Sequence, residues 1–214
     1  MADSLRLLPG FIQTKAKKAG VENDSLPVFR KAFFAAKNIK EAKMYISGMG
    51  QFVLHINGKK IGDHFLDPGS TNYSKSAEFV CFDVTHDLLN GSNVLGVELG
   101  NGFYFVPALA HRYKKLLVQY GYPKMICYLR ICYEDGKVQD IVSDNSWKTT
   151  TSGTLFSSIY GGEDYDASKL SAKWDLPGFD DRSWKNAVLS TDNPKNLVAQ
   201  MADPVKIMEV FRPK

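Results

Sequence analysis

Two short stretches carry side chains suited to holding a small polar ligand. In the first, residues 100–104 read Gly-Asn-Gly-Phe-Tyr, so the amide of Asn101 stands close to the rings of Phe103 and Tyr104. Sugars present apolar ring faces that stack on aromatic side chains, and hydroxyls that need amide or carboxylate partners. These residues therefore predict a carbohydrate-binding platform. The alternative is that both rings lie in the core, or at an interface near the end of a strand.

The second stretch is an acidic loop, residues 161–166, which reads Gly-Gly-Glu-Asp-Tyr-Asp. Calcium takes six or more oxygen ligands, so Glu163, Asp164 and Asp166 are candidate calcium ligands, although their spacing is not that of an EF-hand. Glu163 and Asp166 could instead accept hydrogen bonds from sugar hydroxyls. The competing interpretation is a solvated turn whose carboxylates cap nearby backbone amides. Calcium is the one cofactor that the sequence suggests.

Hydrolysis of a glycoside would need two carboxylates on either side of the scissile bond, one of them with a raised pKa. Glu98 in a predicted strand and Glu163 in the acidic loop could form such a pair. A chain with 23 acidic residues, however, offers pairs of this kind by chance. We therefore expect no catalytic residue in this chain.

The composition is that of an ordinary globular protein and favours no highly charged partner. Hydrophobic residues make up 44% of the 214 positions, charged residues 23%, and the net charge is +4. This length suits one large β domain better than two small ones. The densest basic cluster, Lys15, Lys17 and Lys18, is not interleaved with aromatic residues, so no nucleic-acid partner is expected. No apolar run is long enough to span a bilayer, so no membrane partner is expected either.

The cysteines indicate neither a disulfide framework nor a metal site. Cys81, Cys127 and Cys132 are odd in number, and the last two are five positions apart in a strand-like run. Side chains at that spacing point to opposite faces of a strand and cannot pair locally. No Cys/His spacing suggests zinc. We expect three buried free thiols.

Most of the chain after Pro27 has the alternating pattern of β-strands. Asn57-Gly58 is the strongest hairpin signal, because both central residues of a type I′ turn need a positive φ, and residues 134–136 mark a second hairpin. Only residues 85–89 look helical, as a single turn with Thr85 as its N-cap. The expected strands are residues 28–34, 43–47, 51–56, 78–84, 93–99, 125–133, 137–142, 147–150, 154–160 and 205–211.

About ten short antiparallel strands with long loops indicate an all-β fold, a jelly-roll or galactose-binding-like β-sandwich. The last predicted strand, 205–211, is expected to close the sheet. Residues 161–194 are polar and too long for an ordinary connection, so they should either be functional or wrap over the core. We expect Trp174 and Trp184 to fasten this segment by burying their rings.

A series of motifs then follows in a set order along the chain. They occupy residues 42–46, 56–63, 66–73, 82–85, 93–104, 144–147, 158–167 and 174–184. In this order they resemble the N-terminal β domain of bacterial α-L-rhamnosidases, over roughly residues 27–190. The resemblance implies a jelly-roll module that precedes the catalytic domain, whose hydrolytic machinery lies in a separate helical barrel. Some members of that family bind L-rhamnose with the help of a calcium ion.

The chain departs from the family pattern at the positions that would hold a ligand. Phe103 stands where the family usually has tryptophan, and Asn101 where aspartate is common. Ser74 and Lys75 match positions where sugar-binding members carry acidic and amide groups that hold calcium. A lysine would repel a cation, so calcium-dependent rhamnose binding is not expected at that point.

The resemblance divides the chain into an N-terminal extension, residues 1–26, a β-sandwich accessory domain, 27–190, and a connecting segment or start of a next domain, 191–214. The leading hypothesis is a non-catalytic accessory module that packs against the catalytic domain of the same full-length polypeptide and helps bind a rhamnose-containing carbohydrate. The alternatives are a stand-alone lectin-like module and a structural spacer. A spacer would expose an apolar patch, for which the candidates are Phe105, Val106, Leu109, Leu116 and Leu117.

The cellular location is left open by the residues themselves. The first twelve residues lack the apolar run of a secretory signal, so the protein is either cytoplasmic or separated from its leader. The family resemblance favours export, to the periplasm or the outside of the cell.

Overall fold

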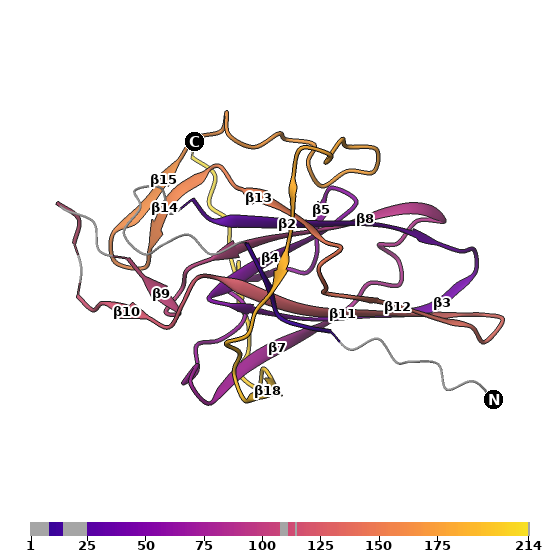
Figure 1. Ribbon diagram of the computed structural model, residues 1–214, viewed down its shortest axis with the longest axis horizontal. Helices are drawn as coiled ribbons and strands as arrows, with labels where there is room; N and C mark the ends of the chain where they lie inside the picture. Colours follow the sequence, from indigo (N-terminus) through magenta and orange to yellow (C-terminus); the bar gives the residue numbers. More distant parts are fainter. Residues whose placement is uncertain (1–8, 15–24, 108–110, 114, 214) are drawn as a thin grey trace.

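A computed structural model describes residues 9–14, 25–107, 111–113 and 115–213 of the chain, and these residues form two β-sheets stacked face to face (Figure 1). The predicted all-β sandwich is therefore confirmed. Within the described ranges no helix is present, and so none that could cross a membrane. The basic cluster Lys15, Lys17 and Lys18 lies outside the described residues.

The larger sheet has the strand order β17-β1-β11-β3-β7-β18, and β12 pairs with β11 beyond the end of β1. Its pairings are antiparallel except that of β7 with β18, which is parallel. The strands are β1 (Ile12–Gln13), β3 (Ile39–Met49), β7 (Ser76–Asp83), β11 (Lys124–Tyr133), β12 (Val138–Val142), β17 (Val188–Leu189) and β18 (Asn196–Ala199).

The smaller sheet has the order β16-β13-β2-β8-β4-β5. Its strands are β2 (Pro27–Ala35), β4 (Gln51–Ile56), β5 (Lys59–Lys60), β8 (Gly91–Gly100), β13 (Lys148–Thr151) and β16 (Lys185–Asn186). Three further pairs lie outside the two sheets: β6 (His64–Phe65) with β19 (Val205–Lys206), β9 (Phe105–Val106) with β10 (Val118–Gln119), and β14 (Thr154–Ser158) with β15 (Gly162–Tyr165). The β9–β10 and β14–β15 hairpins lie at the same end of the molecule (Figure 1).

The core lies between the sheets because alternate residues of each long strand point inward. Strand β11 shows this pattern clearly, since Met125, Cys127, Leu129 and Ile131 are buried and the residues between them are partly exposed. The facing sheet contributes inward side chains from β4 and β8. These are Phe52, Leu54, Ile56, Leu95, Val97 and Leu99.

The turn signals of the sequence are found where they were predicted. Asn57 and Gly58 have φ angles of 52° and 83°, as a type I′ turn requires, and they join β4 to β5. Gly136, with φ of 81°, closes the hairpin between β11 and β12. Gly50, with φ of 102°, lies between β3 and β4, where the chain leaves one sheet for the other.

Two predicted elements are different in the structure. Residues 85–87 form a single hydrogen-bonded turn, closed by the amide of Asp87 on the carbonyl of Val84 at 3.1 Å, which does not continue as a helix; the Thr85 hydroxyl donates to the Asp83 carboxylate at 2.7 Å and accepts the Ala42 amide at 2.9 Å. Of the predicted strand 205–211 only Val205–Lys206 is a strand, and it pairs with β6 instead of closing a main sheet. Strand β18 lies at the edge of the larger sheet, beside β7.

The cysteines are free, as predicted, but they are not all buried. Cys127 lies in the core, Cys132 is partly buried, and Cys81 is exposed. Cys81 occupies an outward position of β7, opposite Tyr45 of β3, and the alternation of that strand places its side chain on the solvent side.

Residues 174–184 cover the outer face of the smaller sheet, as expected for the long polar segment. Beneath them lies Arg30, which is 2% exposed and donates to the carbonyl oxygens of Trp174 at 2.9 Å and Leu176 at 3.1 Å. Its guanidinium also pairs with the Asp181 carboxylate. The Trp174 ring is buried and stacks on Trp184 with 6.2 Å between ring centres.

The closeness of this cover to the sheet gives a first prediction. An alanine Cβ at Gly96 of β8 would lie 2.7 Å from Cη2 of Trp174 and 3.1 Å from Cβ of Asp175, so Gly96→Ala should force the cover outward. We expect the free energy of unfolding to fall by about 1–3 kcal/mol, the usual cost of overpacking. Denaturant titration measures this change, and tryptophan fluorescence should shift toward that of solvent-exposed rings.

Gly100→Ala on the same strand is the matched control. A Cβ there would meet nothing nearer than Cβ of Gln51 at 3.4 Å, an ordinary contact. Equal stability of the two variants would contradict close packing of Trp174 on the sheet.

Candidate functional site

The predicted sugar platform begins with a side chain that is already engaged. Asn101 follows the end of β8 and is 2% exposed. Its side-chain amide donates to the carbonyl oxygen of Ser157 at 2.7 Å, and its own carbonyl accepts the backbone amides of Tyr104 and Phe105, both at 3.1 Å. Asn101 therefore shapes the 101–105 turn and ties it to β14.

The two rings that follow Asn101 lie in different environments. Phe103 is 44% exposed and contacts Tyr160 edge-on, with 6.5 Å between ring centres. Tyr104 is buried against Tyr73 and Tyr120, at 5.2 and 6.0 Å between ring centres. Burial raises the pKa of Tyr104 to about 12. One ring thus lies in a buried aromatic cluster while the other is open to solvent.

The three acidic side chains of residues 161–166 lie on or beside β15 and have separate environments. Both carboxylate oxygens of Asp164 accept hydrogen bonds at 2.5 Å from Arg112, which also donates to the carbonyl of Gly161 at 3.0 Å. Asp166 accepts the amide and hydroxyl of Ser168 at 2.9 and 2.6 Å, and these bonds lower its pKa. Glu163 is exposed, opposite Ser157 of β14.

The arrangement does not suit a calcium ion at these residues. A calcium ion would need several oxygens around one centre. Here the Asp164 carboxylate forms an ion pair with Arg112, and the Asp166 carboxylate accepts hydrogen bonds from Ser168. Over the described part of the chain, no three Asp, Glu, His or Cys side chains gather closely enough to hold a metal. The hydroxyl of Ser74 donates to the side-chain oxygen of Asn72 at 2.6 Å.

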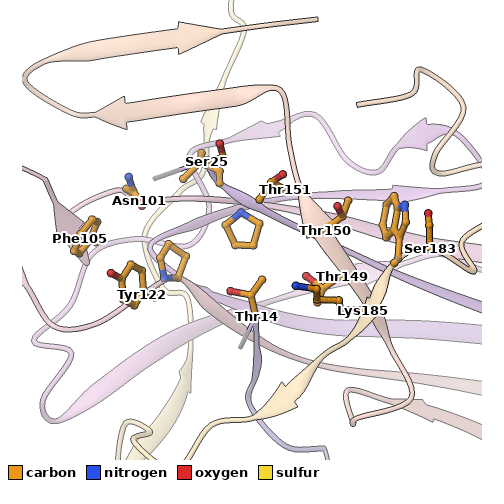
Figure 2. A pocket seen from close by; sticks show the side chains of 14 residues that line it. Thr14, Ser25, Asn101, Phe105, Tyr122, Thr149, Thr150, Thr151, Ser183 and Lys185 are labelled. Carbon is orange, nitrogen blue, oxygen red and sulfur yellow. The ribbon is translucent and has the colours of Figure 1, made fainter. Parts of the chain in front are cut away.

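A pocket of about 350 Å³ lies beside Asn101, where β13 and β16 face the segment that leads into β11 (Figure 2). We call it the threonine pocket. Phe105 and Tyr122 stand at one end of it, and Ser183 and Lys185 at the other. Its lining residues are Thr14, Ser25, Leu26, Pro27, Asn101, Phe105, Tyr122, Pro123, Thr149, Thr150, Thr151, Ser183, Trp184 and Lys185.

The lining of the threonine pocket combines hydroxyl groups with aromatic faces. The rings of Phe105 and Tyr122 stack at 5.5 Å between centres. Thr149 donates its hydroxyl to the carbonyl of Val28 at 2.9 Å, whereas Thr150 and Thr151 make no side-chain hydrogen bond within the described structure. Among the described residues, the lining contains one charged side chain, that of Lys185, and no carboxylate. Such a surface suits an uncharged polyhydroxylated ligand.

Sequence reasoning identified Asn101 and missed the rest of this pocket. The run Thr149–Thr151 was assigned to a strand, and its side chains become a pocket wall only because β13 lies next to the edge of the smaller sheet. Trp184 was expected to fasten the covering segment, which it does by stacking on Trp174, yet it also lines the pocket. The features of the sequence that could have indicated this pocket are the run Thr149–Thr151 and the later Trp184.

The conceivable catalytic pair, Glu98 and Glu163, does not line the threonine pocket. Glu98 lies half-buried on the outer face of β8, two residues from Gly96. Burial raises the pKa of Glu98, the charge of His55 opposes this shift, and the charges of Asp175 and Glu163 add to it. The two glutamates are therefore close enough to influence each other without sharing this pocket.

The raised pKa of Glu98 gives a second prediction. A carboxyl whose pKa is higher in the folded than in the unfolded chain binds its proton more tightly when folded, so its contribution to stability is lost as pH rises above the ordinary value of 4.5. Glu98→Gln should therefore be more stable than the parent chain at pH 7, and the difference should vanish toward pH 3. Thermal unfolding across this range measures it. A stability gain that does not change with pH would contradict the assignment.

Comparison with known proteins shows the same domain within longer enzymes. The family model of the α-L-rhamnosidase N-terminal domain matches residues 37–209. An α-L-rhamnosidase of Formosa agariphila is 35% identical over 91% of this chain and 21% of its own length. One from Streptomyces avermitilis is 34% identical over 80% of this chain and 16% of its own length. The chain thus spans about a fifth of the length of these relatives.

Solved structures show the same relation. The α-L-rhamnosidase from Dictyoglumus thermophilum has a TM-score of 0.82 at 37% identity, and that from Aspergillus terreus 0.84 at 27% identity. Each comparison covers 94% of this chain and 23% of the solved one. The match of fold and sequence over nearly all the described strands leads to one conclusion: this chain belongs to the family of α-L-rhamnosidase N-terminal domains.

Proposed function

We propose that this chain is a non-catalytic accessory domain of an α-L-rhamnosidase, and that it packs against the catalytic domain of the same polypeptide. The observation that carries the proposal is the share of the relatives' length that this domain covers, which is only about a fifth. The other four-fifths of those proteins leave ample room for a separate catalytic domain. The parent reaction would be hydrolysis of a terminal α-L-rhamnosyl linkage.

The chemistry of the acidic side chains supports the same proposal. Glycoside hydrolysis places two carboxylates across a site that holds the sugar. Here Asp164 is paired with Arg112 and Asp181 with Arg30, while Oδ2 of Asp175 lies 2.5 Å from Nδ1 of His55. These carboxylates hold loops in place.

The proposal predicts that this chain alone does not hydrolyse an aryl α-L-rhamnoside. The measurement is release of the aryl alcohol at high protein concentration, with a complete α-L-rhamnosidase as the positive control. Clear turnover would contradict the proposal. Glu98→Gln and Glu163→Gln would then show whether those two carboxylates are responsible, since each should abolish a two-carboxylate reaction.

Carbohydrate binding is a second function, favoured by the lining of the threonine pocket. Its volume, about 350 Å³, falls within the usual range for small-molecule sites. The hydroxyls of Thr150 and Thr151, which have no hydrogen-bond partner among the described residues, and the nearby aromatic rings provide both contacts that a sugar needs. Phe103 offers a competing site, since its ring is exposed at the tip of the 101–105 turn.

Calorimetry with L-rhamnose and with galactose, with and without calcium, tests this second function and separates the two sites. If the pocket binds sugar, Thr151→Val should weaken binding because it removes a hydroxyl and keeps the volume, whereas Phe103→Ala should have no effect. If Phe103 stacks on the sugar, Phe103→Ala should weaken binding by about 1–2 kcal/mol. Absence of heat with either sugar would leave the packing role alone.

A structural spacer should expose an apolar patch, and only some of the residues expected to form that patch are exposed. Leu116 and Leu117 are about half exposed, Phe105 is partly buried, and Val106 is buried. Leu109 lies outside the described residues. Export of the parent protein to the periplasm or beyond stays a proposal that rests on the family.

A further inference from the structure

Large apolar side chains stand in solvent along the last part of the described chain. We call residues 201–211 the C-terminal strip. Next to it, Phe65 and Leu66 are 41% and 61% exposed, and Phe65 pairs with Val205 between β6 and β19. Single exposed apolar residues are ordinary, but a contiguous set marks an interaction surface. The exposed side chains of the strip are Met201, Val205, Ile207, Met208, Val210 and Phe211, with exposed fractions from 56% to 94%.

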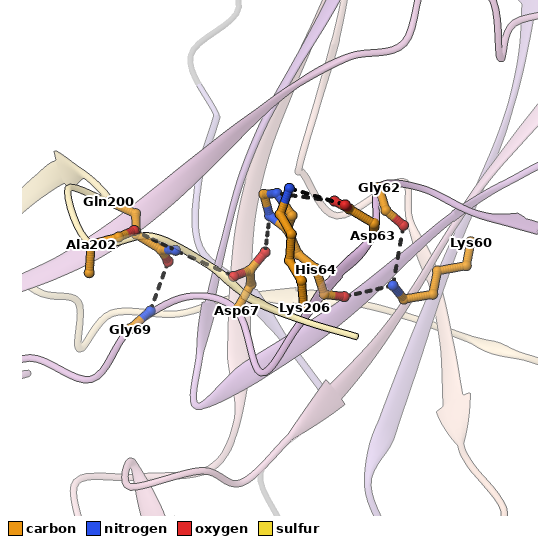
Figure 3. Close-up of polar contacts among 9 residues, drawn as sticks. All are labelled: Lys60, Gly62, Asp63, His64, Asp67, Gly69, Gln200, Ala202 and Lys206. Atoms are coloured by element: carbon orange, nitrogen blue, oxygen red, sulfur yellow. Dashed lines mark hydrogen bonds and ion pairs between the residues drawn. The ribbon is translucent and has the colours of Figure 1, made fainter. Parts of the chain in front are cut away.

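Polar contacts hold the start of the strip against the domain (Figure 3). The side-chain oxygen of Gln200 accepts the backbone amide of Gly69 at 2.9 Å, and its amide nitrogen donates to Asp67 at 3.4 Å. Asp67 is 4% exposed, and its other oxygen lies 2.8 Å from Nδ1 of His64. A buried carboxylate thus has partners on both the domain and the segment that leads into the strip.

Further along, Lys206 pairs with Asp63 at 3.0 Å, and β19 pairs antiparallel with β6. These contacts hold the start of the strip, up to Lys206, and leave its apolar side chains uncovered. Residues 207–213 form no strand or turn, so the domain itself gives this stretch little support.

The composition of the strip matches the centre of a protein interface. Phenylalanine and methionine are enriched at such centres, whereas lysine and glutamate are depleted. The strip carries Met201, Met208 and Phe211, together with three charged residues, Asp203, Lys206 and Glu209. Lys206 is already paired with Asp63.

We infer that the C-terminal strip docks onto the catalytic part of an α-L-rhamnosidase carried by the same polypeptide. The inference rests on the proposed function and adds to it the surface through which the domain contacts the catalytic part. The occupant follows from the comparisons: the family match extends to residue 209, so most of the strip belongs to the shared domain, and relatives carry that domain in chains about five times as long. A covalently linked neighbour also has a high effective concentration at this surface.

The test compares the 214-residue chain with the intact polypeptide of its gene, by hydrogen exchange of the backbone amides of residues 207–212 and by hydrolysis of an aryl α-L-rhamnoside. In the 214-residue chain these amides should exchange at nearly the rate of an unfolded peptide. In an active intact polypeptide they should exchange at least about tenfold more slowly. Met208→Asp with Phe211→Asp in the intact polypeptide should remove that protection.

Phe34→Asp is the matched control, because Phe34 is 68% exposed and lies at the end of β2, outside the strip. It should leave the protection of the amides of residues 207–212 unchanged. An active intact polypeptide whose strip exchanges freely would overturn the docking inference and leave the proposed function standing. An intact polypeptide without rhamnosidase activity would overturn both. Protection that rises with the concentration of the 214-residue chain alone would instead assign the surface to a second copy.

Discussion

Arg30 lies beneath residues 174–184 with its guanidinium withdrawn from water, and the outer face of the smaller sheet depends on it. A buried cation is tolerated only when its donors are satisfied, and removal of one partner of a buried pair typically costs 3–5 kcal/mol. Here the donors reach the carbonyl oxygens of Trp174 and Leu176 and the carboxylate of Asp181. The covering segment can therefore stay irregular in backbone and still hold one position.

That position has consequences for the rest of the molecule. Trp174 packs over Gly96, and Trp184 stacks on Trp174 and lines the threonine pocket. The contact that covers the sheet thus also builds one wall of the pocket. Asp175 of the covering segment pairs with His55 of β4, and its charge adds to the effect of burial, which is the main reason that the pKa of Glu98 is raised.

The described surface separates two kinds of chemistry. At the edge of the smaller sheet, hydroxyls and rings gather around a pocket that no carboxylate of the described residues lines. Along the C-terminal strip, apolar side chains stand in solvent above a polar network that includes Asp67 and Gln200. Hydroxyls and rings suit a small polar ligand, whereas exposed apolar side chains suit a protein surface.

The amino-acid sequence by itself determined the all-β class, the hairpins at Asn57-Gly58 and Gly136, and the family, because alternation, turn chemistry and motif order are local properties of a chain. It could not determine which side chains meet. Only the tertiary structure decided that Tyr104 is buried while its neighbour Phe103 is exposed. It also decided that Arg112 pairs with Asp164, and that Thr149–Thr151 form a wall of the pocket. These outcomes depend on contacts between residues tens of positions apart, which arise only when sheets and loops pack together.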